Sequence, residues 1–260
     1  MAFEHHLDIR LQFKQQLETT REYIIPFVSR HARVGEGTRV LDIGCGTGGV
    51  CMAFAGAGAQ TLGVDLSDTS IAVARDFCAE RAGQMRFLLQ NVYEFETDEK
   101  FDLIVFKDSI EHIPEQDRII AHVKRYLSPG GKLFFGFPPW RMPFGGHQQV
   151  IRNSKFLSLL PYYHLLPKGV YRALIRMAKE SPSIEAFLME TKDLGISTAR
   201  FERIVKQTGY KITDSEFFLF NPIYRYKFGI RPRKQWAWVK ATPHLRDFVT
   251  TGVYYLIEPE

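Results

Sequence analysis

Val40-Leu41-Asp42-Ile43-Gly44-Cys45-Gly46-Thr47-Gly48-Gly49 is the stretch that decides the fold. The pattern predicts a buried strand that breaks into a glycine-rich turn and then opens a helix. Because glycine lacks a Cβ atom and tolerates positive φ, three alternating glycines after an apolar strand indicate a turn that a ligand approaches closely. A second apolar segment, Gly63-Val64-Asp65, ends in an acid. Together the two segments predict a nucleotide-type cofactor site at the edge of a doubly wound sheet.

Strand-like and helix-like segments alternate through the first 140 residues. This alternation predicts an α/β fold with a doubly wound, Rossmann-like, mostly parallel seven-stranded sheet and helices on both faces. The early helices are predicted at residues 6–30, at 48–57, after the caps Ser67 and Asp68, and from Pro114 to 126. The strands are predicted at residues 38–43, 60–65, 85–90, 101–106, 132–137, 210–220 and 252–257.

The regular alternation stops after the fifth predicted strand. Ser128-Pro129-Gly130-Gly131 predicts a turn before that strand, and the segment 138–196 is rich in proline, glycine, aromatic and basic residues, with one predicted helix near 169–180. A helix that begins after Ser197 and ends at Gly209 then restores the pattern. The domains expected are a helical segment at 1–34, a core formed by 35–140 and 197–260, and an inserted cap, the substrate region, at 141–196.

The composition is ordinary for a globular chain of 260 residues, with 45% hydrophobic residues. No apolar run reaches the roughly 20 residues of a membrane helix, and the first residues lack the pattern of a secretion signal. Cys45, Cys51 and Cys78 match neither a disulfide framework nor a CxxC metal site, and the first two are predicted to be small packing residues. We therefore expect a cytoplasmic protein.

The positive charge is concentrated in the second half of the chain. Residues 1–140 carry 15 Lys/Arg and 19 Asp/Glu, whereas residues 141–260 carry 19 and 10. The excess favours an anionic substrate, a phosphate-bearing molecule or an acidic membrane surface, unless it only aids solubility. One basic cluster runs from Arg225 to Lys234 next to Trp236 and Trp238, which could touch nucleic acid or lipid headgroups.

Four segments in this order resemble the class I S-adenosylmethionine (SAM) dependent methyltransferases. They are the Asp42-x-Gly44-x-Gly46-x-Gly48 loop, the strand ending at Asp65, the strand 101–105 followed by Ser109-Ile110-Glu111-His112-Ile113, and Leu127-Ser128-Pro129-Gly130-Gly131-Lys132-Leu133. The glycine loop by itself would also suit a dinucleotide enzyme, but its spacing differs from the usual Gly-x-Gly-x-x-Gly. The resemblance implies that the chain is a SAM-dependent methyltransferase.

The resemblance also implies which residues bind SAM. The glycine loop and Asp42 would hold the methionine and ribose portion, and Asp65 would accept hydrogen bonds from both ribose hydroxyls. Asn91 stands where the family often has Asp, and its amide oxygen can still accept from the adenine amino group. The complete predicted set is Asp42, Gly44, Gly46, Gly48, Asp65, Leu66, Asn91, Val92, Lys107 and Asp108.

Catalytic candidates are expected after the fourth and fifth strands, because ligands bind at the carboxyl edge of such a sheet. A hydroxyl acceptor needs a general base, and His147, which follows Pro143-Phe144-Gly145-Gly146, and His112 fall there. In the family the histidine at the position of His112 often has a structural role, and His147 could equally be a loop residue bonded to a carbonyl. Trp140, Tyr162, Tyr163 and Arg172 are candidate acceptor contacts, although the aromatic residues could equally be core.

The expected function is methyl transfer to a small, anionic acceptor at oxygen. RNA or protein methylation by the basic surface, and a SAM-binding protein without methyl transfer, remain alternatives, and an NAD oxidoreductase is a more distant one. No metal ligands and no nucleic-acid partner are predicted, and the oligomeric state is left open.

Overall fold

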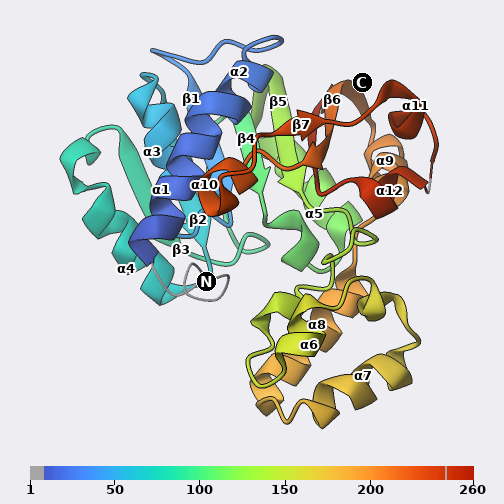
Figure 1. Ribbon diagram of the computed structural model, residues 1–260. Coiled ribbons are helices and arrows are strands. Elements are labelled where there is room, and N and C mark those ends of the chain that lie inside the picture. The colour runs from blue at the N-terminus through green and yellow to red at the C-terminus, as the bar shows by residue number, and fades with distance from the viewer. Residues whose placement is uncertain (1–8, 244) are drawn as a thin grey trace.

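The computed structural model of the chain describes residues 9–243 and 245–260 (Figure 1). Its centre is an eight-stranded sheet in the order β3-β2-β1-β4-β5-β8-β6-β7. The neighbours from β3 to β5 pair in parallel, and β8, β6 and β7 continue the sheet with antiparallel pairs. The strands are β1 (Arg39–Ile43), β2 (Gln60–Asp65), β3 (Met85–Leu89), β4 (Phe101–Lys107), β5 (Leu127–Phe137), β6 (Tyr210–Phe220), β7 (Arg233–Lys234) and β8 (Gly252–Pro259).

The strand order places a switch point between β1 and β4. The chain moves outward from β1 to β3 and then returns to β4 on the other side of β1. Loops at the carboxyl ends of the two strands therefore diverge, which opens a crevice of the kind in which α/β proteins bind ligands. The glycine loop leaves β1 at this edge, and the segment with Glu111 and His112 follows β4.

Helices cover both faces of the sheet because the central strands are buried on both sides. Val40 packs in a cluster with Phe27 and Phe54, whereas Leu41 packs in a cluster with Ile120 and Phe201. The α-helices are α1 (Ile9–Thr19), α2 (Ile25–Val28), α3 (Gly49–Gly56), α4 (Asp68–Phe77), α5 (Gln116–His122), α6 (Lys155–Leu159), α7 (Lys168–Met177), α8 (Pro182–Leu194), α9 (Thr198–Gln207), α10 (Tyr224–Phe228), α11 (Ala237–Lys240) and α12 (Leu245–Val249). Shorter 3₁₀ turns are η3 (Ala79–Arg81), η4 (Ile110–His112), η5 (Val123–Tyr126), η6 (Gln148–Val150) and η7 (Tyr163–Leu165).

The N-terminal helix is less regular than its sequence predicts. Leu7, which contributed to the predicted pattern, lies outside the described residues. From Ile9 the helix runs to Val28 but includes a π-helical segment, η2 (Thr20–Ile24). The π segment ends at Ile24, two residues before Pro26, whose ring would clash with the preceding turn of an unbroken α-helix.

Three details of the predicted secondary structure were wrong. The sheet has eight strands rather than seven, because Arg233 and Lys234 add a short edge strand beside β6. The predicted turn at 128–131 lies within β5, where the pairing with β4 shifts register. The helix expected from Pro114 begins at Gln116, because Glu115 has a left-handed backbone with φ of 48°.

Caps and glycines set other boundaries as predicted. Ser67 caps α4 through Ser70, and Ser197 caps α9 through Arg200. Gly209, with φ of 70°, follows that helix before β6 begins. The sequence therefore predicted most accurately the helix ends that are determined by one local hydrogen bond or by a left-handed glycine.

The segment between β5 and α9 contains three α-helices where one was predicted. In Figure 1, α6, α7 and α8 form a lobe below the sheet. The lobe encloses an apolar cluster of its own, in which Leu157, Tyr171 and Leu188 are buried. None of the helices in the described part of the chain is long and apolar enough to span a bilayer.

Candidate cofactor and acceptor site

The glycine loop adopts the backbone that its sequence predicts. Gly44, Gly46 and Gly48 have φ values of 75°, 51° and 83°. A Cβ atom on Gly44 would lie 2.6 Å from the Cβ of Ser109, so this glycine allows the loop to contact the segment after β4. A Cβ on Gly46 would meet no atom within 4 Å. The loop is therefore tight against the protein at Gly44 and faces open space at Gly46.

Asp65 connects the glycine loop to the end of β2. Its Oδ2 accepts a hydrogen bond from the Gly46 amide at 2.8 Å, and its Oδ1 accepts one from the Ser67 amide at 2.8 Å. The carboxylate is half-buried, and each oxygen has a further lone pair that a hydroxyl could use. Leu66 is exposed directly beside it. The position suits recognition of a diol next to the loop.

Asp42 lies beneath the loop rather than at its surface. It is 1% exposed, and its Oδ2 is 3.6 Å from the Cys51 thiol. Burial, and to a smaller extent nearby Asp65, raise the pKa of Asp42 to about 7 against the opposing effects of Cys51 and Lys107. The protonation of this side chain therefore depends on the charges near the loop. Cys45, Cys51 and Cys78 are buried free thiols, which agrees with the packing role predicted for the first two.

Replacement of Asp42 by Asn is expected to stabilise the protein without ligand at alkaline pH. Because the folded pKa lies above the unfolded one, the carboxyl contributes stability that is complete below the unfolded pKa and is lost as the pH rises through about 7. The difference in the free energy of unfolding between Asp42→Asn and the unaltered protein should thus increase with pH in favour of the variant, by at most about 4 kcal/mol. Urea unfolding at acidic and alkaline pH measures this difference, and a pH-independent difference would contradict it.

Asn91 and Val92, the predicted adenine contacts, follow β3. The Oδ1 of Asn91 accepts a hydrogen bond from the Tyr93 amide at 3.0 Å, which forms a turn of its own. Val92 is buried in the core cluster. Their contact with an adenine ring stays a prediction.

Charged side chains meet at the end of β4. Lys107 is buried, and its ammonium group pairs with Asp108, whose backbone has a φ of 52°. Gly136 on β5 pairs with Lys107 in the sheet, and a Cβ there would lie 3.0 Å from the lysine Cδ. The glycine therefore leaves room for the lysine chain. Lys227 on α10 interacts electrostatically with Asp108 and Lys107, and burial lowers the pKa of its ammonium group.

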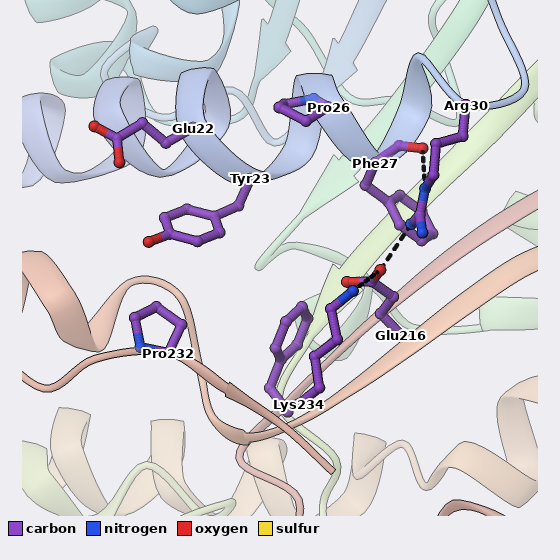
Figure 2. Close-up of a pocket in the computed structure, with 9 residues that line it drawn as sticks. Glu22, Tyr23, Pro26, Phe27, Arg30, Glu216, Pro232 and Lys234 are labelled. Carbon is purple, nitrogen blue, oxygen red and sulfur yellow. Dashed lines mark hydrogen bonds and ion pairs between the residues drawn. The ribbon is translucent and has the colours of Figure 1, made fainter. Parts of the chain in front are cut away.

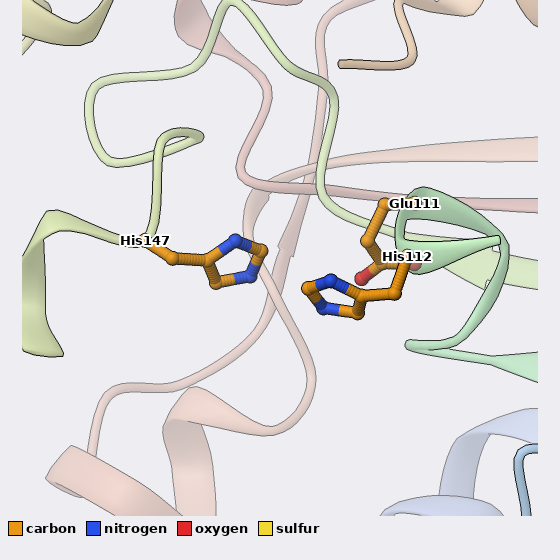
Figure 3. A group of neighbouring side chains, drawn as sticks. All are labelled: Glu111, His112 and His147. Atoms are coloured by element: carbon orange, nitrogen blue, oxygen red, sulfur yellow. The ribbon is translucent and has the colours of Figure 1, made fainter. Parts of the chain in front are cut away.

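Three proton-binding side chains converge beyond this pair (Figure 3). Glu111 and His112 belong to η4, and His147 reaches them from the loop after β5. Ligand atoms of the three residues lie within 4.8 Å of one another, and the two imidazole centroids are 4.9 Å apart. The geometry thus brings together both histidines that the sequence analysis selected and adds Glu111 to them.

Burial controls the protonation of Glu111 and His147, whereas His112 is exposed at the edge of the cluster. Burial raises the pKa of Glu111 to about 8, an effect increased by Asp108, and it lowers the pKa of His147 to about 4, an effect increased by His112. Neither Oε2 of Glu111 nor Nδ1 of His147 has a hydrogen-bond partner within the described residues, although both atoms are buried. A neutral imidazole with a free nitrogen can take a proton. The same donors could also hold a divalent cation.

The cap contributes one aromatic ring to the cluster. Phe187 on α8 lies 5.9 Å from His112 and 6.1 Å from His147, measured between ring centroids. The side chain of Gln116 donates to the carbonyls of Ile110 and Leu194, which joins η4 to the end of the same cap helix. The cap is therefore fixed next to the two histidines.

The other predicted acceptor contacts are mostly engaged within the protein. Tyr163 is buried against Tyr171 in the cap, and Arg172 pairs with Glu185. The Tyr162 hydroxyl donates to the carbonyl of Phe248. Trp140 packs edge-on against His164, whose ring bonds to the Trp140 carbonyl. Each of these four residues therefore has a partner within the protein. Their contact with an acceptor stays a prediction.

Sequence reasoning missed Glu111, Phe187 and Lys227 as site residues. Glu111 was visible as the neighbour of His112, and its burial beside another acid was the missing information. Phe187 belongs to a helix that was not predicted, and Lys227 was assigned to an outer basic cluster. Phe187 and Lys227 reach the edge of the sheet only because the cap and α10 fold next to it.

A separate hollow of about 350 Å³ lies between α2 and the β6–β7 edge (Figure 2). Tyr23, Phe27 and Pro232 form part of its wall. Its charged residues are already paired, since Glu216 lies 2.9 Å from Arg30 and 2.6 Å from Lys234, and Glu22 pairs with Arg225 outside the hollow. This hollow therefore lacks the unpartnered polar atoms that mark the histidine cluster.

Comparisons with known proteins agree with this arrangement. A family model described as a methyltransferase domain matches residues 40–131. The ubiquinone biosynthesis O-methyltransferase of Coxiella burnetii is 31% identical over 137 residues, which cover 52% of this chain and 56% of that protein. The protein of the same name from Idiomarina loihiensis is 34% identical over 153 residues, covering 56% of this chain and 58% of the relative. The chain thus spans little more than half the length of these curated relatives.

The fold also matches beyond the region of sequence similarity. A SAM-dependent methyltransferase from Clostridium acetobutylicum superimposes with a TM-score of 0.57 at 15% identity, over 99% of this chain and 97% of that one. Residues 40–131 therefore match a methyltransferase-domain family, and the chain has the fold of a SAM-dependent methyltransferase.

Proposed function

We propose that this protein transfers a methyl group from SAM to a hydroxyl oxygen of a small aromatic acceptor. The observation that carries the proposal is the convergence of Glu111, His112 and His147 beside the glycine loop. Ser109 contacts Gly44 of that loop and directly precedes η4, so one short segment joins the two halves of the site. The names of the relatives, which are O-methyltransferases, support oxygen as the accepting atom.

The residues around the loop fit SAM. The open space at Gly46 leaves room for the ligand, and Asp65 offers its carboxylate to the ribose hydroxyls. Lys107 and Asp108 would adjoin the methionine portion. When bound, SAM supplies a methyl group on a sulfonium centre, from which a thioether is a good leaving group.

The protein's own contribution is to orient the acceptor and accept its proton. His147 is neutral at physiological pH and has a free Nδ1, so it can receive the hydroxyl proton. A free phenol, with a pKa near 10, is too weak an acid to give its proton to this imidazole, but the hydroxyl becomes strongly acidic as its oxygen bonds to the methyl carbon, and the neutral imidazole can accept the proton at that point. Phe187 gives an aromatic acceptor a ring to pack against, and correct alignment alone accelerates such a reaction greatly.

We further propose that the acceptor carries a negative charge. Lys107 and Lys227 both lie close enough to Asp108 to interact with it electrostatically. Because burial raises the pKa of nearby Glu111 to about 8 and so keeps it neutral at pH 7, the two lysines beside Asp108 would favour an anionic acceptor.

Methyl-labelled SAM and two catechols test the reaction and the acceptor's charge together. We expect label on a hydroxyl oxygen of 3,4-dihydroxybenzoate and, with a higher KM, on that of 4-methylcatechol, which lacks the carboxylate. Equal KM values would remove the anionic preference but keep the reaction. SAM binding without transfer to any hydroxyl acceptor would contradict the proposed reaction, and labelling of tRNA or protein instead would favour the macromolecular alternative.

A further inference from the structure

Residues 221–250, which link β6 to β8, account for the chain's positive charge. They hold seven Lys/Arg and one Asp, a net charge of +6, whereas the whole chain has +5. The segment includes α10, β7, α11 and α12. In Figure 1, β7 and α11 lie at the opposite end of the molecule from the cap helices α6 and α7. Lys227 lies near Asp108 and Arg246 is buried against Glu202, so the charge that attracts an anionic partner to the β7 end comes from the remaining cations.

Two exposed tryptophans lie in the same segment. Trp236 is 48% exposed and Trp238 is 64% exposed, and their rings stack with centroids 6.3 Å apart. The guanidinium of Arg233 lies 5.0 Å from the centre of the Trp236 ring. Two large rings in water beside a cation form an amphipathic surface rather than scattered exposed residues.

Two further exposed apolar residues are paired with Arg233 and Gln235, the neighbours of the tryptophans in the chain. Phe220 pairs with Arg233 in the β6–β7 ladder, and Gln235 donates to the carbonyl of Val249 at 2.8 Å. Both Phe220 and Val249 are exposed. We call this region the Trp–Arg surface and define it as Phe220, Arg231, Arg233, Trp236, Trp238 and Val249.

Two cations of this surface remain available for a partner. Lys234 pairs with Glu216, and Arg225 pairs with Glu22. Arg231 and Arg233 are exposed and form no ion pair within the described residues. Their charges are thus free to meet an anion from outside the molecule.

We propose that the Trp–Arg surface docks this protein onto an anionic phospholipid bilayer. Tryptophan side chains favour the interface between headgroups and acyl chains, and arginines are attracted by anionic headgroups. Exposed Phe220 and Val249 enlarge the apolar area that enters the interface. A single-stranded nucleic acid would use the tryptophans as stacking platforms, but it offers nothing for the aliphatic Val249 and would leave one face of each stacked ring unavailable.

Vesicle sedimentation of the full chain tests the proposal directly. We expect binding to vesicles that contain phosphatidylglycerol, weak binding to pure phosphatidylcholine, and a decrease with salt. Arg231→Gln combined with Arg233→Gln should weaken the binding by about 30-fold, because each cation near the surface contributes roughly a fivefold factor. Trp236→Ala combined with Trp238→Ala should weaken it at least about tenfold.

The matched control lies on the cap. Phe156 is 72% exposed and Met177 is 75% exposed, so Phe156→Ala combined with Met177→Ala removes comparable apolar surface elsewhere. We expect this variant to bind vesicles normally, and all variants to methylate a soluble acceptor at the normal rate. Binding lost only in the cap variant, equal binding to both vesicle types, or salt-sensitive binding to tRNA without vesicle binding would each overturn the proposal.

Discussion

His147→Ala is expected to lower kcat for an aromatic hydroxyl acceptor by about 10²–10⁴-fold, the usual contribution of a general base. The affinity for SAM should stay unchanged, because His147 lies on the loop after β5 and not on the glycine loop. Its ring faces Glu111 and His112, and its buried Nδ1 has no partner within the described residues. Steady-state kinetics together with calorimetric titration of SAM measure both quantities.

His122→Ala is the matched control for this prediction. His122 is half-buried like His147, but its ring bonds to Tyr126 on the helix α5 side of the sheet. We expect that variant to keep normal turnover. A turnover of His147→Ala within a factor of about two of the unaltered protein would exclude His147 as the base, and the comparison with His112→Ala would then show which histidine acts.

A chelator separates proton transfer from cation binding at the same cluster. If Glu111, His112 and His147 only handle a proton, EDTA should leave kcat unchanged. Loss of activity with EDTA, recovered by Mg²⁺ or Mn²⁺, would contradict this role and assign the three side chains to a metal ion instead.

Asp65→Ala should raise the dissociation constant of SAM at least about 100-fold, since it removes hydrogen bonds from two hydroxyls to a charged acceptor. The substitution also removes the acceptor of the Gly46 amide and thereby releases the glycine loop. Both effects act on the ligand's ribose and methionine portions rather than on the acceptor. The KM of the acceptor at saturating SAM should therefore change little.

Asp68→Ala provides the control for Asp65. This exposed acid lies in the first turn of α4, three residues after Asp65, and it contributes a similar charge without contacting the loop in any hydrogen bond of the described residues. We expect normal SAM affinity for Asp68→Ala. Equal weakening by both variants would indicate a general charge effect, and no weakening by Asp65→Ala would remove Asp65 from the site.

The sequence predicted the backbone of the glycine loop better than it predicted the surroundings of the two histidines. The glycine loop and Asp65 depend on local features, a positive φ at three positions and an acid at a strand end, and local sequence patterns determine both. Gly44 illustrates the limit of this reasoning. Its need for a small side chain arises from Ser109, which is 65 positions away in the chain and meets the loop only after folding.

The acceptor half depends on burial and on cap packing, which sequence patterns did not reveal. Arg172 was predicted to meet an anionic group, but the structure gives it Glu185 as a partner on a helix that the sequence analysis did not find. Glu111 was read as part of a motif, yet its burial beside Asp108 is what raises its pKa. Both outcomes result from neighbours that are distant in sequence or from solvent exclusion.

A crystal structure of the protein with S-adenosylhomocysteine, the demethylated form of SAM, tests the central claim most directly. The account predicts the ribose hydroxyls on the carboxylate of Asp65, the amino acid portion over Gly44 and Gly46, and the sulfur directed toward His147 and Glu111. An empty crevice at saturating ligand, or a ligand bound elsewhere on the molecule, would contradict it.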